Sequence, residues 1–135
     1  VRFDDAAFRG DAYPTYAWGA DAVEVEVDLA TFAVRCRRFW TAVDVGRAIQ
    51  PRLAEGQIEG GSLQALGFGH LEKVTTRDGR IAEDRLATCI IPTAVDAPPM
   101  AVALVEVPYA HGPFGAKGIG ELPMDGGAPA LAAIE

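Results

Sequence analysis

The sequence feature that most constrains the fold is a helical segment from Pro51 to about Lys73 that contains five glycines. The residue spacing over this segment is helical, and a proline is tolerated in the first turn of a helix. Each glycine inside a helix costs about 1 kcal/mol relative to alanine. A free helix would not carry this cost, so we predict that this one packs closely against another element.

One face of the predicted helix combines small residues with two amides. Residues three or four positions apart share a helix face, and here they are Gln57, Gly60, Gln64, Gly67 and Leu71. A face of this kind suits a backbone that approaches a flat polar ligand or another tightly packed element.

A second glycine-rich stretch, residues 115–121, ends in a carboxylate. Gly115, Gly118 and Gly120 have no Cβ and tolerate positive φ, which lets the backbone pass very close to a rigid object. Glu121 follows directly, and the small apolar run 128–134 behind it favours a C-terminal helix. Taken alone, these seven residues are equally compatible with a solvated turn that carries Glu121 on the surface.

Alternating patterns upstream of the helix predict strands. Apolar and acidic residues alternate over 22–29, as is typical of a strand with one wet face, and the alternation resumes over 34–43. Cross-strand charge pairs would help to set the register. These pairs are expected between two acidic and two basic residues: Glu24, Glu26, Arg35 and Arg37.

Downstream of the helix, the sequence predicts a hairpin with an Asp-Gly turn at 78–79, an extended apolar segment over 86–92 and a last strand over 102–107. Residues 1–20 show no sustained period and are predicted to be looped or extended. The order of the elements indicates an α+β fold. We expect a mostly antiparallel sheet with the long glycine-containing helix and the C-terminal helix.

Length and charge restrict the function. A chain of 135 residues is normally one domain with its own core. A formal net charge of −7 and the lack of a basic stripe argue against a nucleic-acid or anionic membrane partner. No run approaches the ~18 apolar residues that span a bilayer. Half of the residues are hydrophobic, so we expect some apolar surface to meet a partner.

The chain ends and the cysteines also carry expectations. The sequence starts with Val1 instead of Met and stops inside a helical pattern, so we expect a processed chain or a piece of a longer one, soluble and cytoplasmic. Cys36 and Cys89 are too few and too distant for a metal motif or a disulfide framework. Each lies in an apolar strand pattern, where a free cysteine behaves as a small hydrophobe.

Several chemistries are disfavoured. Residues 115–117 lack the approach to a phosphate-loop ending, and the glycine order is wrong for a dinucleotide fingerprint. His70 and His111 are isolated from other metal ligands, and no serine or cysteine has a nucleophile context. The polar candidates in glycine-lined settings are Glu121, Gln57, Gln64 and Lys117.

At these residues the sequence resembles the molybdenum hydroxylases, the xanthine dehydrogenase and aldehyde oxidase family, in the last part of their molybdenum-cofactor-binding large subunit. The matching pieces stand in the family's order: 44–49 with Pro51, 56–61 with Gln64 and Gly67, 91–93 with Asp96, and 115–121. The resemblance covers nearly the whole chain from about Tyr13, so residues 1–135 would be the C-terminal portion of a cofactor-binding domain. The departures from the family pattern are Gln50, Ala65 and Cys89.

The resemblance implies roles for individual residues. Glu121 would be the general base in the hydroxylation of an aldehyde or a purine-like N-heterocycle, with water as the oxygen source. Gln57 would hydrogen-bond a molybdopterin-type cofactor, with the cytosine dinucleotide form among the candidates. The cofactor's dithiolene would hold the metal, with no protein ligand. The backbone expected to pack beside the metal is that of Lys117, Gly118, Ile119 and Gly120.

The implied partners are the rest of the large subunit, iron–sulfur and flavin (FAD) domains or subunits, and a small-molecule substrate. A second interpretation belongs to a different class. A glycine-rich α+β module could complete the fold of a larger assembly without catalysis, with Glu121 as a structural cap. Replacing Glu121 separates the two, because catalysis predicts loss of turnover with the cofactor retained, whereas a structural role predicts loss of assembly.

Overall fold

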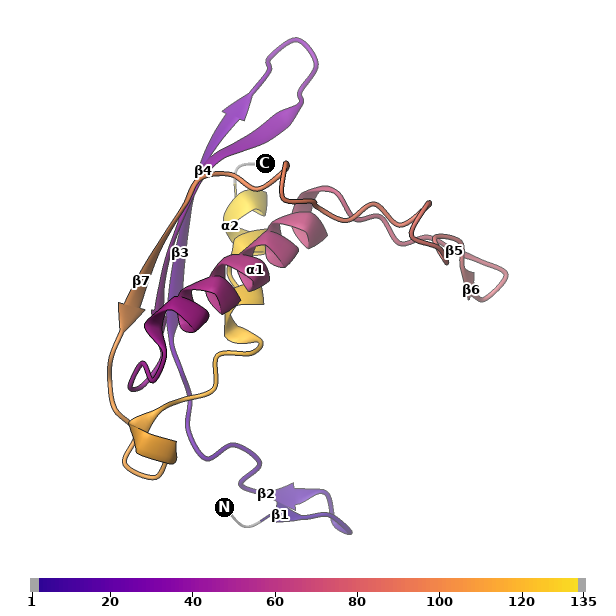
Figure 1. Cartoon of the computed structure of the whole chain (residues 1–135). Helices are drawn as coiled ribbons and strands as arrows, with labels where there is room; N and C mark the ends of the chain where they lie inside the picture. Colours follow the sequence, from indigo (N-terminus) through magenta and orange to yellow (C-terminus); the bar gives the residue numbers. More distant parts are fainter. Residues whose placement is uncertain (1–2, 134–135) are drawn as a thin grey trace.

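The computed structural model describes residues 3–133 and contains a three-stranded sheet with two helices on one face (Figure 1). The sheet strands are β3 (Gly19–Val27), β4 (Val34–Asp44) and β7 (Met100–Val105). The helices are α1 (Pro51–His70) and α2 (Gly127–Ala132). The α+β class and both helices are confirmed, while Ile134, the last residue of the predicted C-terminal helix, lies outside the described residues.

Shorter elements complete the chain. Two small ribbons lie away from the sheet: β1 (Phe3–Asp4) with β2 (Arg9–Gly10), and β5 (Thr76–Arg77) with β6 (Arg80–Ile81). Two 3-10 turns, η1 (Pro113–Gly115) and η2 (Leu122–Met124), border the segment that carries Glu121. Asp78 and Gly79 both have positive φ, 51° and 76°, as the predicted Asp-Gly hairpin turn requires.

The main sheet is mixed. β3 pairs antiparallel with β4, as expected, but β4 pairs in parallel with β7. The parallel pair arises because α1 and the long segment after it return the chain to the end of the sheet where β4 begins. Sequence patterns predicted these strands but not the parallel pairing.

A bulge between Glu24 and Val25 shifts the register of β3 against β4. Arg38 therefore lies opposite Glu24 and pairs with it at 3.9 Å, in place of the expected Arg35 or Arg37. Glu26, which lies opposite Arg35, pairs with Arg37 at 3.4 Å. These side chains are exposed, so the pairs contribute little to stability.

Two clusters of buried side chains join the sheet to the helices. Phe39, Leu66 and Leu131 form the first, and Val43, Val45 and Ile58 form the second. The predicted close packing of α1 is observed at its buried glycines. A Cβ at Gly61 would come within 2.7 Å of Pro123, and one at Gly67 within 2.4 Å of Pro92.

Two sequence expectations differ from the structure. Helix α1 ends at His70, three residues before the predicted end. Residues 86–92 form no strand, because Thr88 and Cys89 turn back to donate to the carbonyl of Arg85. Cys89 therefore lies in a turn region and not in a strand, although it and Cys36 are both free and half-buried.

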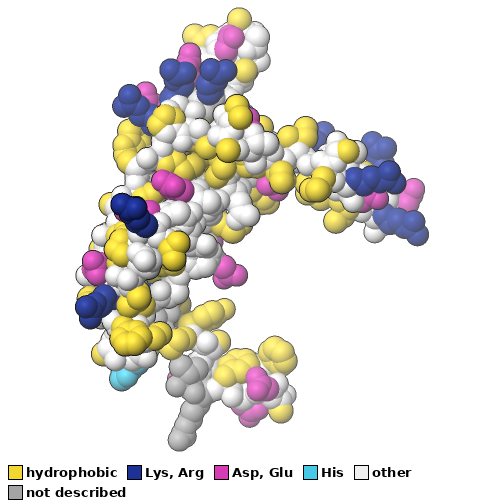
Figure 2. Space-filling view, viewed as in Figure 1, with side chains coloured by type: hydrophobic (Ala, Val, Ile, Leu, Met, Phe, Trp, Pro, Cys, Tyr) yellow, Lys and Arg dark blue, Asp and Glu magenta, His cyan; other side chains and the backbone are white. Residues whose placement is uncertain are grey.

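Much of the chain lies outside this packed body. The segment between α1 and β7 forms an arm that ends at β5 and β6, and residues 3–18 form a second one (Figure 1). Hydrophobic side chains run along the first arm, and basic ones gather at its tip (Figure 2). Within the described residues, no helix has the length and apolar character needed to cross a membrane.

Candidate functional site

The glycine-rich loop 115–121 is hydrogen-bonded to the segment that follows β4. Arg47 N–H donates to the Gly115 carbonyl at 2.9 Å, and Lys117 N–H donates to the Val45 carbonyl at 3.0 Å. The two backbones approach closely because Gly46 adopts φ +67°, where a Cβ would lie 2.6 Å from the Gly115 oxygen. The loop is thus fixed to the end of the central strand.

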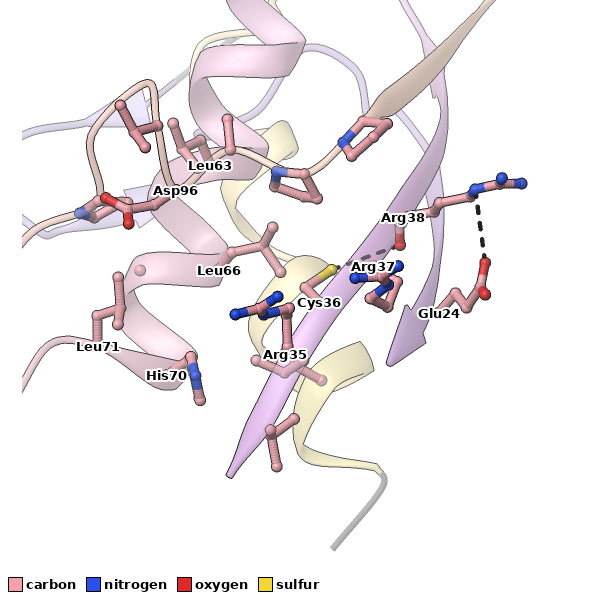
Figure 3. A pocket seen from close by; sticks show the side chains of 18 residues that line it. Glu24, Arg35, Cys36, Arg37, Arg38, Leu63, Leu66, His70, Leu71 and Asp96 are labelled. Carbon is pink, nitrogen blue, oxygen red and sulfur yellow. Dashed lines mark hydrogen bonds and ion pairs between the residues drawn. The ribbon is translucent and has the colours of Figure 1, made fainter. Parts of the chain in front are cut away.

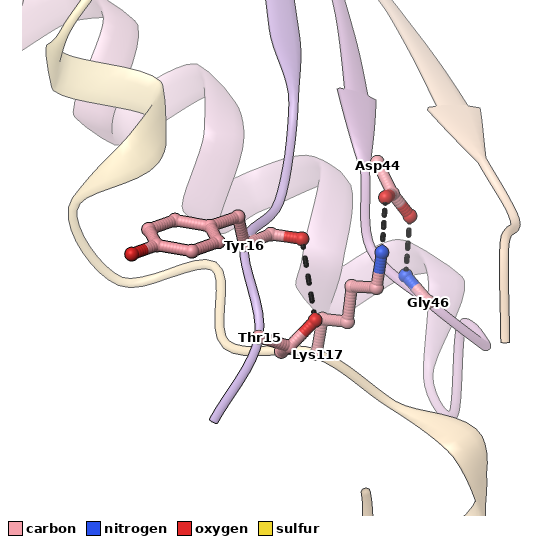
Figure 4. A network of polar contacts seen from close by, with 5 residues as sticks. All are labelled: Thr15, Tyr16, Asp44, Gly46 and Lys117. Carbon is pink, nitrogen blue, oxygen red and sulfur yellow. Dashed lines mark hydrogen bonds and ion pairs between the residues drawn. The ribbon is translucent and has the colours of Figure 1, made fainter. Parts of the chain in front are cut away.

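A buried ion pair secures the same junction. Lys117 Nζ lies 2.5 Å from Asp44 Oδ2, and the two side chains are 9% and 6% exposed. The other carboxylate oxygen, Oδ1, accepts a hydrogen bond from Gly46 N–H at 2.9 Å (Figure 4). Burial by itself would raise the pKa of Asp44, but the hydrogen bonds from Lys117 and Gly46 and the charge of Lys117 outweigh it and hold that pKa below its ordinary value.

This pair changes the interpretation of Lys117. Its ammonium group is paired with Asp44 and mostly buried, so its backbone is the part of Lys117 that is more available to a ligand. Sequence reasoning included Asp44 in a motif but did not assign it a partner. The local signal was an aspartate at a strand end two residues before a glycine, which favours a side-chain bond to the backbone at that turn.

The middle of the loop leaves bare backbone on its outer side. Gly118 and Gly120 are exposed, and no atom lies within 4 Å of where their Cβ atoms would be. Ile119, between them, packs against the second buried cluster. The N–H groups of residues 118–121 donate no hydrogen bond to any residue that the structure describes.

Glu121 follows this bare backbone and immediately precedes η2. Its carbonyl accepts a hydrogen bond from Met124 N–H at 2.8 Å, and the next two residues are packed, Leu122 against the second cluster and Pro123 against Gly61. The Glu121 side chain is exposed and forms neither a cap bond nor an ion pair within residues 3–133. The backbone is therefore fixed while the carboxylate is free.

Gln57 lies on the exposed side of α1 and reaches the same loop. Its Nε2 donates to the Gly120 carbonyl at 3.2 Å, one residue before Glu121. The structure therefore brings Gln57 next to the loop of residues 117–121. Gln64 is exposed two turns further along the helix, and its side chain makes no hydrogen bond with a described residue.

The cavities are distributed unevenly around this site. One cavity of about 760 Å³ lies beside the C-terminal half of α1, between Leu66, His70 and Cys36, and no predicted site residue lines it (Figure 3). A second cavity of about 750 Å³ borders Lys117 and Gly118. In the part of the chain that the structure describes, no three His, Cys, Asp or Glu side chains are grouped to hold a metal ion.

A family model described as the molybdopterin cofactor-binding domain matches residues 2–98, more than half of the chain. This chain belongs to that family. The matched range contains Asp44 and Gln57 and ends before the loop of Glu121. The resemblance to the molybdenum hydroxylases inferred from sequence motifs is thereby confirmed.

Curated relatives and solved structures support the same family. The chain is 38% identical over 79% of its length to a probable xanthine dehydrogenase subunit of Bacillus subtilis (strain 168). It is 33% identical over 85% of its length to the carbon monoxide dehydrogenase large chain of Afipia carboxidovorans. Quinoline 2-oxidoreductase from Pseudomonas putida 86 matches 87% of the chain with a TM-score of 0.80 and 38% identity.

These relatives are much longer than the chain. The chain spans 14% of each of the two curated relatives and 15% of the quinoline 2-oxidoreductase chain. It therefore matches a small part of each of these proteins.

Proposed function

We propose that this chain supplies part of a molybdenum hydroxylase active site, in which Glu121 is the general base for the hydroxylation of an aldehyde or N-heterocycle. The observation that carries the proposal is a carboxylate, free of any ion pair with a described residue, that directly follows two exposed glycines, Gly118 and Gly120, in a segment whose N–H groups are unpaired within the described residues. Two relatives are named for xanthine and quinoline, which are planar N-heterocycles, and this supports a substrate of that class.

The residues present fit a bound molybdopterin-type cofactor. Gly118 and Gly120 leave open space where a side chain would block close approach, and the N–H groups of residues 118–121 are unpaired within the described residues. Gln57 would hold the cofactor with its amide, and the backbone of residues 117–120 would lie beside it. When bound, the cofactor supplies the two-electron redox chemistry of the hydroxylation, and its cytosine dinucleotide form is one candidate.

Glu121 would accept a proton at a carboxylate oxygen during the reaction. A general base must lie within about 3 Å of the proton that it takes. The packing of Leu122 and Pro123 fixes the backbone of Glu121, while its exposed side chain can turn toward a substrate or an activated water. Gln57 and the bare loop orient the reacting groups around it.

The proposed assembly comprises the rest of the large subunit with iron–sulfur and FAD-containing domains or subunits. Relatives named as a subunit or a large chain support it. We place the assembly in the cytoplasm, where free thiols such as Cys36 and Cys89 stay reduced.

The first prediction concerns Glu121→Gln in the assembled enzyme. The amide matches the carboxylate in shape but cannot accept the proton, so turnover per bound molybdenum should fall by about 10² to 10⁴. Steady-state rates with molybdenum content quantified test this.

The matched control is Glu55→Gln, an exposed carboxylate on α1, which should retain normal turnover. Turnover of Glu121→Gln within about threefold of wild type would remove Glu121 from the role. A tenfold change in rate corresponds to about 1.36 kcal/mol of activation free energy, and a threefold change to less. Loss of assembly, with no cofactor bound, would favour the structural module instead.

A further inference from the structure

We propose that Asp44 is a positioning residue that fixes the loop of Glu121 through Lys117 and Gly46. This inference rests on the proposed function of Glu121. Asp44 ends the central strand, and both of its carboxylate oxygens are used, one by Lys117 Nζ and one by Gly46 N–H. A single buried carboxylate thereby holds the two backbones that meet in the bridge between Gly46 and Ala116; its bonds to Lys117 and Gly46 are drawn in Figure 4.

Stability alone does not account for this pair. Two charges lose their water on burial, so a buried ion pair is often no more stabilising than apolar side chains of the same size. The Asp44–Lys117 pair lies next to the second apolar cluster, where Val43 and Val45 flank Asp44 in sequence. What the pair adds to such packing is a defined geometry between the strand end and the loop.

The conformation of the loop depends on the Asp44–Lys117 pair because few other contacts fix the loop in place. Residues 118–121 donate no hydrogen bond to a described residue, and Gly118 and Gly120 add backbone freedom. Upstream of Glu121, the loop is held by the pairing around Lys117, by Ile119 in the second cluster and by the bond from Gln57 to Gly120. A misplacement of about 1 Å can cost about 10² in rate.

Three variants of the assembled enzyme test the proposal. Asp44→Asn keeps an acceptor for Gly46 N–H but removes the charge, and Lys117→Met keeps the length of the side chain. Asp44→Asn combined with Lys117→Met leaves no lone buried charge, so this double variant separates lost geometry from lost folding. Lys73→Met and Asp78→Asn make the same chemical changes at exposed positions and serve as controls.

Hydrogen exchange at the Arg47 and Lys117 amides reports directly on how the loop is held, because both donate across the junction. We expect exchange at least about tenfold faster in the double variant. We also expect kcat per molybdenum to be about 10² lower, with KM changed less than about threefold. Lys117→Arg keeps a cation beside Asp44, so its exchange rates and its kcat should lie closer to those of the wild type than do those of Lys117→Met.

Unchanged exchange at these two amides would overturn the inference. So would faster exchange with normal kcat, provided that Glu121→Gln is inactive in the same assay. If Glu121→Gln stays active, the proposed function fails, and the exchange rates still decide whether Asp44 holds the loop.

Discussion

At the residue scale, the side-chain amide of Gln57 can serve two functions. One N–H of its amide reaches across 63 residues of sequence to the Gly120 carbonyl. The second N–H and the amide oxygen are left for a bound group, since a glutamine side chain carries two donors and an acceptor. The same side chain can therefore hold the loop of Glu121 and contact a cofactor.

We predict that Gln57→Ala lowers molybdenum occupancy. Removing the amide leaves polar atoms of a buried ligand unpaired, which costs roughly 1–3 kcal/mol. Metal analysis of the purified enzyme is the measurement, and Gln64→Ala, an exposed glutamine two turns away on the same helix, is the control. Full occupancy with only a raised KM would show that Gln57 serves the substrate and not the cofactor.

Local residue chemistry suggested Gln57 and Glu121 as site candidates, whose roles stay predictions, but it gave no indication of the pairing of Asp44. Glycines around Glu121 and a small-residue helix face around Gln57 are features of neighbouring positions. The partner of Asp44 lies 73 residues away, and no periodic pattern links a strand-end aspartate to a lysine in a distant loop. The sequence also predicted a polar role for Lys117, which its buried pairing with Asp44 replaces.

At the scale of elements, glycines serve two distinct purposes in this structure. The fold requires a glycine at position 46 for two reasons. Its φ is +67°, and a Cβ there would clash with the Gly115 oxygen. Gly120 is not required by the fold of this chain, since open space surrounds its Cβ position. The second kind of glycine makes sense where a bound group approaches the backbone.

Two alanine variants separate these purposes. Gly46→Ala should lower the free energy of unfolding by at least about 1–3 kcal/mol, the cost of a strained backbone conformation. Gly120→Ala should keep the free energy of unfolding within about 0.5 kcal/mol of the wild-type value, as is usual for surface changes. It should nevertheless reduce the molybdenum content. Chemical denaturation and metal analysis of the same preparations provide both numbers. Normal molybdenum content in Gly120→Ala would show that nothing packs against this loop.

Sequence patterns predicted the positions of strands and helices better than their partners. Alternation placed β3, β4 and β7 within about three residues because each alternates between exposed positions and positions that are buried or half-buried. The prediction that the apolar run 86–92 is extended was wrong. Apolar character alone does not tell which segment, of this chain or of another, such a run packs against. In this chain its Leu86 and Ile90 are exposed.

At the scale of the whole molecule, the exposed surface is too large for a compact domain. It amounts to 9989 Å², whereas a monomer of 14.3 kDa exposes about 6,800 Å² by the usual scaling. The sheet face opposite the helices is uncovered. It is apolar around Trp40, which lies between Ala22 and Ala101 in register, and it is charged further along β3 and β4, where Glu24, Glu26 and Arg37 are exposed. The arms add exposed side chains such as Trp18 and Val95.

We propose that the rest of a large subunit covers this surface, and we predict that residues 1–135 do not bind the cofactor alone. An obligate interface of this kind should bury more than about 2,000 Å² and resemble a divided core. Expressed separately, the chain should be aggregated or partly folded, should bind a hydrophobic dye and should carry no molybdenum. Size-exclusion chromatography, dye binding and metal analysis test this. A monomer with a sharp cooperative melt and no dye binding would contradict the proposal, because the exposed apolar side chains around Trp40 and on the arms would then need no partner.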